Sequence, residues 1–238
     1  KKENIEAWAM PKSWDNPTKS VFRVKADRLI VWNKYMLERC LKYQNYKGRE
    51  ISVIGVPQYD FFFDKSRLMP REDFCKIYGL DPERKIIFFG SEGKLFPRDK
   101  EIAEILYSFI EKNELVEPAQ LLIRPHYGFK NDEQKFAGLF GKHGVVVDLF
   151  NNKSKYFIDE WDYSNEFTNR FINSLFHSSM IINTVSSLSL DACVLDKPVI
   201  SIMFDGHKGK PFHKSILKMW GYDWNVEVLK TGATRRAL

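Results

Sequence analysis

Residues 182–201 read INTVSSLSLDACVLDKPVIS, and this stretch decides the fold class. An apolar segment ends in a cluster of small hydroxyl side chains, a short helical pattern follows, and Pro198 opens a second apolar segment. Two strands joined through a helix by short connections form the unit from which parallel sheets are built. The stretch therefore predicts a β-α-β unit with Thr184, Ser186 and Ser187 at its first junction and Asp191 one helical turn beyond.

The same alternation reaches back to residue 85. Strand candidates occupy residues 85–90, 120–125, 144–149, 179–184 and 198–203, and helical patterns occupy 99–113, 132–141, 165–177 and 186–195. The strand candidates are almost continuously apolar, which is typical of strands covered on both faces. We therefore predict the α/β class with a Rossmann-like doubly wound parallel sheet, which binds ligands at the carboxyl ends of its strands.

The first 84 residues are less regular. Residues 28–33 and 51–57 read as strands with a helix over 34–43 between them, and a further helix is expected to run from Pro70 to Tyr78. We expect a linker and a remnant of a preceding domain over residues 1–60, and the Rossmann-like domain over residues 61–238. Because the chain begins at Lys1, we expect it to be part of a longer protein.

Composition narrows the class of protein. The 238 residues are 44% hydrophobic and 29% charged, which is typical of a soluble globular protein, and no apolar run is long enough for a membrane span. Three cysteines without metal-like spacing indicate thiols in a reducing, cytoplasmic compartment. The net charge of +6 favours an anionic partner such as a nucleotide, an anionic polymer or a membrane surface. Nucleic acid is not favoured, because the basic residues are scattered among acidic ones.

Two strand ends in the first half of the sheet carry residues that can bind phosphate. Gly90 and Ser91 follow the first strand, where a glycine lets a ligand approach the backbone amides; an ordinary turn is the alternative. Arg124-Pro125-His126 follows the second strand, and the proline fixes the exit direction. Arginine can clamp a phosphate, and histidine can donate to one or carry a proton. A surface arginine and a turn histidine are the alternative.

The junction after residue 183 combines hydroxyl groups with a helix start. Unpaired amides at the first turn and the hydroxyls of Thr184, Ser186 and Ser187 can hold an anion, while Asp191 lies far enough along to accept from ribose hydroxyls. The alternative is a helix cap at Ser186 with a solvated Asp191. A nucleophilic serine is disfavoured, because no GxSxG sequence surrounds it.

The loop after the last predicted strand contains Asp205, His207 and His213. Their spacing fits no standard metal site, and the lysines between them would repel a cation. We therefore expect no metal here.

These pieces together resemble the nucleotide-binding C-terminal domain of GT-B-fold glycosyltransferases. The resemblance rests on GVPQYD at residues 55–60, the Gly90-Ser91 loop, RPH at 124–126 and the stretch from Thr184 to Ser201. The nearest branch builds bacterial surface polysaccharides and includes CDP-glycerol glycerophosphotransferase-like proteins; UDP-N-acetylglucosamine 2-epimerases are more distant. SWDNPT at 13–18 and ADRLIVWN at 26–33 are similar to the segment through which such proteins enter their second domain.

The resemblance implies roles for individual residues. It places the donor diphosphate against Ser186 and Ser187 and the ribose against Asp191. Arg124 and His126 match the exit that faces the donor, and Gly90 and Ser91 match the first phosphate-side loop. His126 and Arg124 are the candidate catalytic residues. The catalytic base of this fold usually comes from the N-terminal domain, so we expect this chain alone to be inactive. A Ser-Ser turn with one aspartate departs from the glycine-rich epimerase turn with paired glutamates, which favours a transferase.

The sequence therefore predicts a transferase in the synthesis of a bacterial cell-surface polysaccharide such as capsule. Its donor would be a nucleotide-activated sugar or polyol phosphate, its acceptor a saccharide or lipid-linked saccharide, and no cofactor or metal would be required. We expect a cytoplasmic protein with peripheral contact to the anionic inner face of the membrane. The alternatives are a UDP-N-acetylhexosamine 2-epimerase-like enzyme and a non-catalytic module that binds an anionic polymer.

Overall fold

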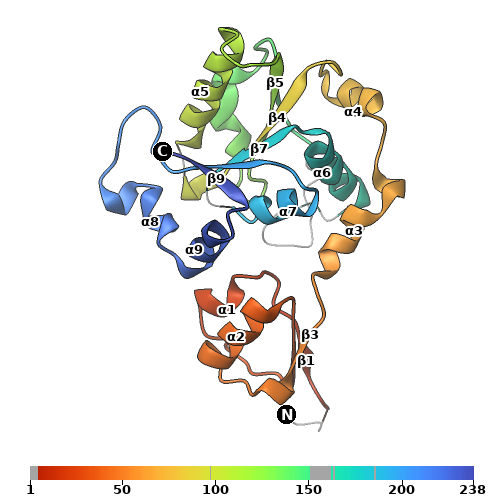
Figure 1. Ribbon diagram of the computed structural model, residues 1–238, viewed down its shortest axis with the longest axis vertical. Coiled ribbons are helices and arrows are strands. Elements are labelled where there is room, and N and C mark those ends of the chain that lie inside the picture. Colours follow the sequence, from red (N-terminus) through yellow and green to blue (C-terminus); the bar gives the residue numbers. More distant parts are fainter. Residues whose placement is uncertain (1–4, 97, 151–161, 163, 185) are drawn as a thin grey trace. The chain divides into compact units, whose positions relative to one another are not determined.

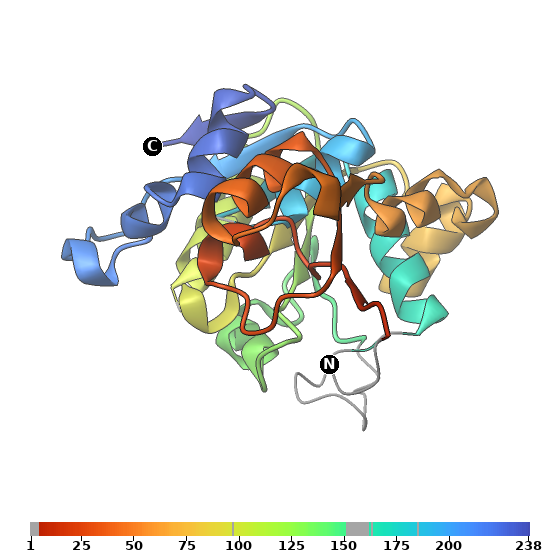
Figure 2. The same cartoon turned by 90° about the horizontal axis from the view of Figure 1, so that it is seen from below.

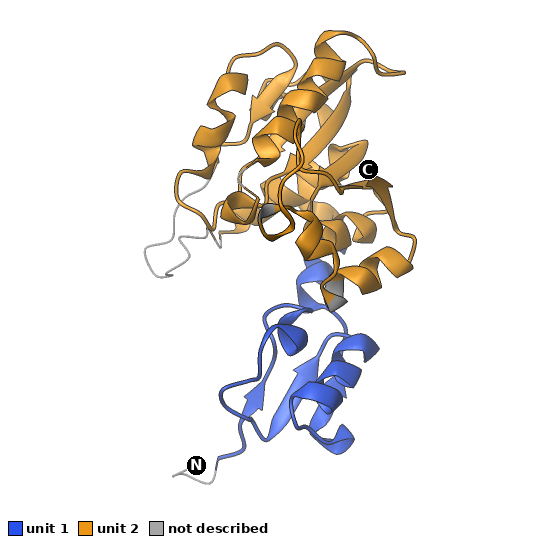
Figure 3. Cartoon of the chain, turned by 90° about the vertical axis from the view of Figure 1, so that its left-hand side faces the viewer, with its two compact units in different colours: residues 1–63 blue, residues 64–238 orange. Residues whose placement is uncertain are grey.

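The structure is a computed structural model that describes residues 5–96, 98–150, 162, 164–184 and 186–238. The chain divides into two compact units, residues 1–63 and 64–238 (Figure 3). No helix within the described ranges is long and apolar enough to cross a membrane. The predicted site residues Gly90 to Asp191 all lie in the second unit.

The first unit is built on a small parallel sheet with strand order β1-β2-β3. Its elements are β1 (Trp8–Ala9), α1 (Asn16–Lys19), β2 (Arg28–Val31), α2 (Lys34–Tyr43), η1 (Gly48–Glu50), β3 (Ile51–Val53), η2 (Pro57–Tyr59) and α3 (Asp60–Phe63), where η marks a 3₁₀ helix. The Asn33 side chain caps α2 by accepting from the Met36 N–H at 2.9 Å. The predicted strand over 51–57 ends earlier, at Val53, and Pro57 opens η2 instead.

The second unit contains a sheet of six parallel strands among the described residues. Along the chain its elements are η3 (Lys65–Arg67), α4 (Arg71–Tyr78), β4 (Lys85–Gly90), η4 (Gly93–Leu95), α5 (Asp99–Glu111), β5 (Ala119–Arg124), η5 (Asp132–Leu139), β6 (Val145–Val147), α6 (Asn165–His177), β7 (Met180–Asn183), α7 (Leu188–Val194), β8 (Val199–Ile202), η6 (Phe212–Lys214), α8 (Leu217–Trp220), α9 (Asp223–Lys230) and β9 (Thr234–Ala237). The predicted α/β class with a parallel Rossmann-like sheet is confirmed.

The strand order determines where a ligand can bind. The sheet runs β6-β5-β4-β7-β8-β9, and every pair of neighbours is parallel. The chain therefore winds outward from β4 to one edge and then returns to β7 to wind toward the other edge. The crevice between β4 and β7 is the point where the order reverses, and open α/β sheets bind their ligands at such points. β4 and β7 lie next to each other in the middle of the sheet (Figure 1).

Alternate residues of the central strands point to opposite faces of the sheet. Phe89 and Ile123 pack in one core with Ile102 of α5, whereas the neighbouring Arg124 contacts Phe167 of α6. Helices α5 and α6 thus cover opposite faces, which Figures 1 and 2 show as the yellow-green and teal ribbons on either side of the strands. Coverage of both faces is why β4 and β5 are almost continuously apolar.

Two predicted helices differ in the structure. The pattern over 132–141 forms a 3₁₀ helix, η5, rather than an α-helix. Gly138 weakens an α-helix there, and the three-residue turn stacks Lys135 over Asp132, where the two side chains form an ion pair. The helix predicted over 186–195 begins at Leu188, two residues later than expected. Strand β9 was not predicted, because its sequence TRRA lacks an apolar pattern.

Candidate functional site

The side chain of Ser91 fixes the loop after β4 through two hydrogen bonds. The Ser91 hydroxyl donates to Asp132 Oδ2 at 2.6 Å and accepts from the Gly93 N–H at 3.0 Å. Ser91 is buried. Its hydroxyl is therefore already used to shape the loop, and its N–H donates to the Arg124 carbonyl oxygen at 3.0 Å, so both polar groups that were predicted to meet a phosphate are engaged inside the protein.

Packing requires a glycine at position 90, which the sequence did not indicate. A Cβ atom at this position would lie 2.3 Å from Leu188 Cδ2. The missing side chain thus lets the first residue of α7 pack directly over the end of β4. Gly90 brings the two sides of the crevice between β4 and β7 together.

His126 is fixed through its main chain. Its N–H donates to Asp132 Oδ2 at 2.8 Å, the same carboxylate oxygen that accepts from Ser91. The imidazole packs against Phe129 with the ring centroids 4.6 Å apart. Burial lowers the pKa of His126 below its usual 6.5. At neutral pH the ring is therefore uncharged, which suits a hydrogen-bond donor or a proton acceptor.

Arg124 lies in an aromatic cage. Its guanidinium carbon is 5.1 Å from the ring centroid of Tyr127, 4.6 Å from that of Phe167 and 4.3 Å from that of Phe171. The residue is buried, and no carboxylate among the described residues pairs with it. Cation–π contacts stabilise this charge without neutralising it, so the carboxyl end of β5 keeps a positive charge under α6.

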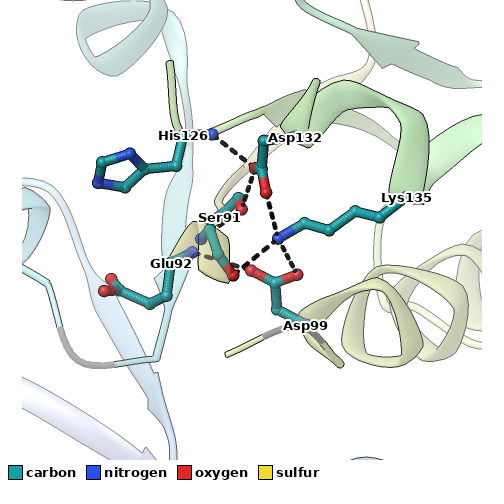
Figure 4. A network of polar contacts seen from close by, with 7 residues as sticks. Ser91, Glu92, Asp99, His126, Asp132 and Lys135 are labelled. Atoms are coloured by element: carbon teal, nitrogen blue, oxygen red, sulfur yellow. Dashed lines mark hydrogen bonds and ion pairs between the residues drawn. The ribbon is translucent and has the colours of Figure 1, made fainter. Parts of the chain in front are cut away.

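Asp132, Lys135 and Asp99 form a buried network beneath the two loops (Figure 4). Lys135 Nζ lies 2.7 Å from Asp99 Oδ1 and 2.9 Å from Asp132 Oδ1. Asp99 Oδ2 accepts from the Glu92 N–H at 2.8 Å. Asp99 is completely buried, and desolvation raises its pKa to about 6 in spite of the neighbouring Lys135 charge. The network ties the loops after β4 and β5 to α5 and η5.

The junction after β7 contains both buried and accessible hydroxyls. Thr184 is fully buried, and its Oγ1 has no hydrogen-bond partner within the described part of the chain. Ser186 is half-buried, and its hydroxyl oxygen accepts from the Leu188 N–H at a long 3.4 Å. Ser187 is exposed at the N-cap of α7, where its side chain makes no capping bond. Ser186 and Ser187 are thus the hydroxyl side chains of this junction that a ligand can reach.

Asp191 lies in the first turn of α7 and is half-buried. The same turn is fixed to β7, because Asn183 Nδ2 donates to Ser189 Oγ at 3.0 Å inside the protein. The carboxylate therefore stands on a helix turn that is anchored to the sheet beside the crevice.

The loop after β8 uses Asp205 as an anchor. The buried Asp205 carboxylate accepts from the Ile216 N–H at 2.8 Å and from the Lys210 N–H at 3.2 Å. Its oxygens thus tie the start of the loop to its middle and to its end. His207 and His213 are exposed, and no group of three or more metal-ligating side chains occurs in the part of the chain that the structure describes.

Sequence reasoning missed the network residues Asp99, Asp132 and Lys135. Asp99 was read as a helix start, and the other two as part of the helical pattern over residues 132–141. The spacing of Asp132 and Lys135 at i and i+3 was the available signal, since such pairs contact each other on helical turns. Nothing in the sequence pairs Lys135 with Asp99, because the two residues lie 36 positions apart.

Comparisons with known proteins place the chain among transferases. A family model described as CDP-glycerol:poly(glycerophosphate) glycerophosphotransferase matches residues 16–210. A comparison with individual curated proteins finds no match to the chain.

Several solved structures are similar to the chain over part of their length. UDP-GlcNAc 2-epimerase from Methanocaldococcus jannaschii, in complex with UDP-GlcNAc and UDP, has 14% sequence identity and a TM-score of 0.54, covering 89% of this chain and 50% of that one. The Neisseria meningitidis UDP-GlcNAc 2-epimerase bound to UDP-GlcNAc has 13% identity and a TM-score of 0.53, covering 88% and 48%. The wall teichoic acid polymerase TagF has 18% identity and a TM-score of 0.46, covering 76% and 40%. This chain thus spans about half or less of these proteins, and the two epimerases share its fold.

Proposed function

The chain belongs to the CDP-glycerol:poly(glycerophosphate) glycerophosphotransferase family, and we propose that it is the donor-binding half of a transferase that builds a cell-surface polymer. The donor is a nucleotide-activated polyol phosphate or sugar, with CDP-glycerol favoured by the family. The catalytic base and the acceptor pocket are then supplied by another part of the full-length protein. This half binds the donor and stabilises the charge that develops on the leaving nucleotide.

The observation that carries the proposal is the gathering of polar groups at the point where the strand order reverses. The ring of His126 lies just after the end of β5, and Ser186 and Ser187 lie just after the end of β7, on the other side of β4. Arg124 adds a buried positive charge at the end of β5. The uncharged donors and the buried Arg124 cation suit a diphosphate, which is anionic and rich in acceptor oxygens, while the Glu92 carboxylate on the same side as His126 is the acidic group that a phosphate has to avoid.

The proposed reaction needs few groups from this half. An acceptor hydroxyl attacks the phosphorus that carries glycerol, the bond to the bridging oxygen breaks, and a nucleoside monophosphate leaves; the hydroxyl proton passes to the base. Charge builds on the leaving phosphate, so fixed donors aimed at it lower the barrier. His126 is uncharged at neutral pH and can donate one ring N–H to that phosphate. Ser186 and Ser187 are placed to bind the other oxygens, and Asp191 to accept from the ribose.

Nucleotide binding by the full-length protein tests the proposal. Thermal unfolding should be measured with and without CDP, UDP and GDP, each at a concentration well above the expected dissociation constant. A nucleotide at 100 times its dissociation constant stabilises the folded state by about 2.7 kcal/mol. At least one of the three should raise the unfolding temperature. If none of them does so, the donor-binding proposal is wrong.

An epimerase acting on a UDP-N-acetylhexosamine is the second candidate, because its fold is shared by the two epimerases described above. The two functions differ in their need for an acceptor. An epimerase converts UDP-N-acetylglucosamine alone, whereas a glycerophosphotransferase releases CMP from CDP-glycerol only when an acceptor hydroxyl is present. Incubation of the full-length protein with each donor, with and without acceptor, separates them.

We also propose that the protein works in the cytoplasm at the inner face of the membrane. Residues 206–222 contain four lysines and two histidines but no acidic residue. Phe212 in this segment is 70% exposed, while Ile216 and Trp220 anchor the segment in the core. An exposed aromatic ring among lysines is suited to an anionic lipid surface.

Vesicle binding tests the membrane contact. The full-length protein should sediment with vesicles that contain phosphatidylglycerol and not with pure phosphatidylcholine. The double variant Lys208→Glu/Lys210→Glu should lose this binding, whereas Lys112→Glu/Lys142→Glu, which changes the net charge equally on other exposed residues, should retain it. Equal binding by both double variants would contradict a role for this loop.

A further inference from the structure

The ammonium group of Lys135 occupies the centre of the buried network. Besides the two carboxylates at 2.7 and 2.9 Å, its Nζ donates to the Gly93 carbonyl oxygen at 3.4 Å. The ammonium therefore lies within reach of oxygen atoms from three segments: α5, η5 and the loop after β4. Lys135 thus holds these segments at set distances from one another.

Asp132 extends this arrangement to the loop after β5. One of its carboxylate oxygens faces Lys135, and the other accepts from both the Ser91 hydroxyl and the His126 N–H. A single side chain therefore joins the ends of two neighbouring strands. The direction of the Asp132 carboxylate depends on Lys135, because the ion pair fixes the oxygen that the loops do not use.

The network engages the main chain of the residues that face the crevice. Its bonds reach the N–H groups of Glu92 and His126. Figure 4 shows the imidazole of His126 and the carboxylate of Glu92 on one side, directed away from Lys135. The network therefore sets where these two side chains stand, while their own polar groups are not bound to Lys135.

We propose that Lys135 is a positioning residue for donor binding, acting through Asp132 and Asp99 to hold the loop of residues 91–93 and the His126 ring in place beside the donor phosphates. This inference rests on the donor-binding function proposed above. Lys135 does not touch the donor. Its effect reaches the ligand through the backbone of two loops, and a displacement of about 1 Å in a positioning contact can cost up to about 100-fold in rate or binding.

A purely structural role makes a different prediction. Removing one member of a buried ion pair is destabilising because the remaining charge loses its partner. If Lys135 only stabilised the fold, its replacement would lower the unfolding temperature, and the folded fraction would still bind nucleotide normally. A positioning role requires that the folded variant bind more weakly.

The test compares Lys135→Met with Lys135→Arg in the full-length protein. Calorimetric titration with CDP, UDP and GDP identifies the nucleotide that the wild type binds. Lys135→Met should weaken its binding roughly 10- to 100-fold at a temperature where the variant is folded. Lys135→Arg keeps the charge and should recover most of the affinity. In turnover with CDP-glycerol, the KM for the donor should rise in Lys135→Met by a larger factor than kcat falls.

Lys142→Met is the matched control, because Lys142 is exposed and its Nζ lies 5.9 Å from the Tyr107 ring centroid, outside the network. It should bind nucleotide like the wild type. Should Lys135→Met fail to fold, Ser91→Ala replaces it in the test, since it leaves the ion pairs in place and removes the hydroxyl that joins the β4 loop to Asp132 and to the Gly93 N–H, and it should weaken binding in the same direction.

The experiment distinguishes a failure of the proposed function from a failure of the positioning role. If the wild type binds none of the three nucleotides, the proposed function is wrong and the inference falls with it. If the wild type binds and the folded Lys135→Met variant binds equally well, the proposed function stands and the positioning role is overturned.

Discussion

Lys135 and Asp99 are joined by an ion pair of 2.7 Å between Nζ and Oδ1, although they belong to different elements and Asp99 is completely buried. The pair does not offset the whole cost of burial, because the pKa of Asp99 is still raised to about 6. The carboxylate that anchors the loop after β4 is thus ionised at neutral pH at a cost in stability.

This raised pKa predicts how stability depends on pH. Between pH 4 and 6 the folded protein retains the Asp99 proton and the unfolded chain releases it, so this group makes the free energy of unfolding fall as pH rises. The fall amounts to about 2 kcal/mol across this interval. Asp99→Asn cannot titrate. The free energy of unfolding of Asp99→Asn minus that of the wild type should therefore increase from pH 4 to 6.

Urea unfolding at pH 4, 5, 6 and 7 measures this difference. Other groups, including His126, whose lowered pKa acts in the opposite direction, contribute to both proteins and cancel in the subtraction. A difference that stays constant with pH would show that the pKa of Asp99 is not raised.

Gly93→Ala should displace the His126 loop. Gly93 has a φ of 62°, and a Cβ there would lie 2.0 Å from Phe129 Cδ2 and 3.1 Å from His126 Cβ. We expect a loss of about 1 to 3 kcal/mol in stability together with weaker nucleotide binding. Gly141→Ala is the control, since Gly141 has a φ of 70° with nothing within 4 Å of the added atom. For Gly141→Ala, chemical unfolding should show only the loss of stability that backbone strain causes. Calorimetric titration should show that this control binds nucleotide like the wild type.

Gly90→Ala should push α7 away from the end of β4, because the new Cβ would lie 2.3 Å from Leu188 Cδ2. Overpacking of this kind costs roughly 1 to 3 kcal/mol. The double variant Gly90→Ala/Leu188→Ala removes the clash, so its loss of stability should be smaller than the sum of the two single losses. Strictly additive losses in urea unfolding would mean that Gly90 and Leu188 do not compete for the same space.

Asp191→Ala tests the proposed contact with ribose. The wild type should bind CDP more tightly than 2′-deoxy-CDP, and the variant should bind both with similar, weaker affinity, because a lost hydrogen bond to a charged acceptor costs about 1.5 to 3 kcal/mol. Glu104→Ala, an exposed acidic residue on α5, is the control for charge. A variant that still discriminates between the two nucleotides would rule out the ribose role while leaving the fold assignment intact.

The elements of the sheet were predictable because their signals are local. Continuous apolar runs identified β4, β5, β7 and β8, and the proline and glycine at residues 70 and 79 bounded α4, whose C-cap Gly79 has the left-handed φ of 66°. Strand β9 escaped prediction because its place in the sheet is set by pairing with β8 and not by its own sequence TRRA.

For the candidate site, the sequence predicted only which residues follow the ends of the strands. The sequence alone determined that Ser91, His126 and Ser186 follow parallel strands, since alternating apolar strands and helices lead to that topology. Only the tertiary structure decided what each side chain does there. Ser91 is directed inward to Asp132, Arg124 is enclosed by three aromatic rings, and Ser186 and Ser187 remain accessible. The physical reason is that the direction of a side chain in a loop depends on partners that are distant in the sequence. Lys135 and Asp99 are such partners, and no local sequence pattern predicts their contact.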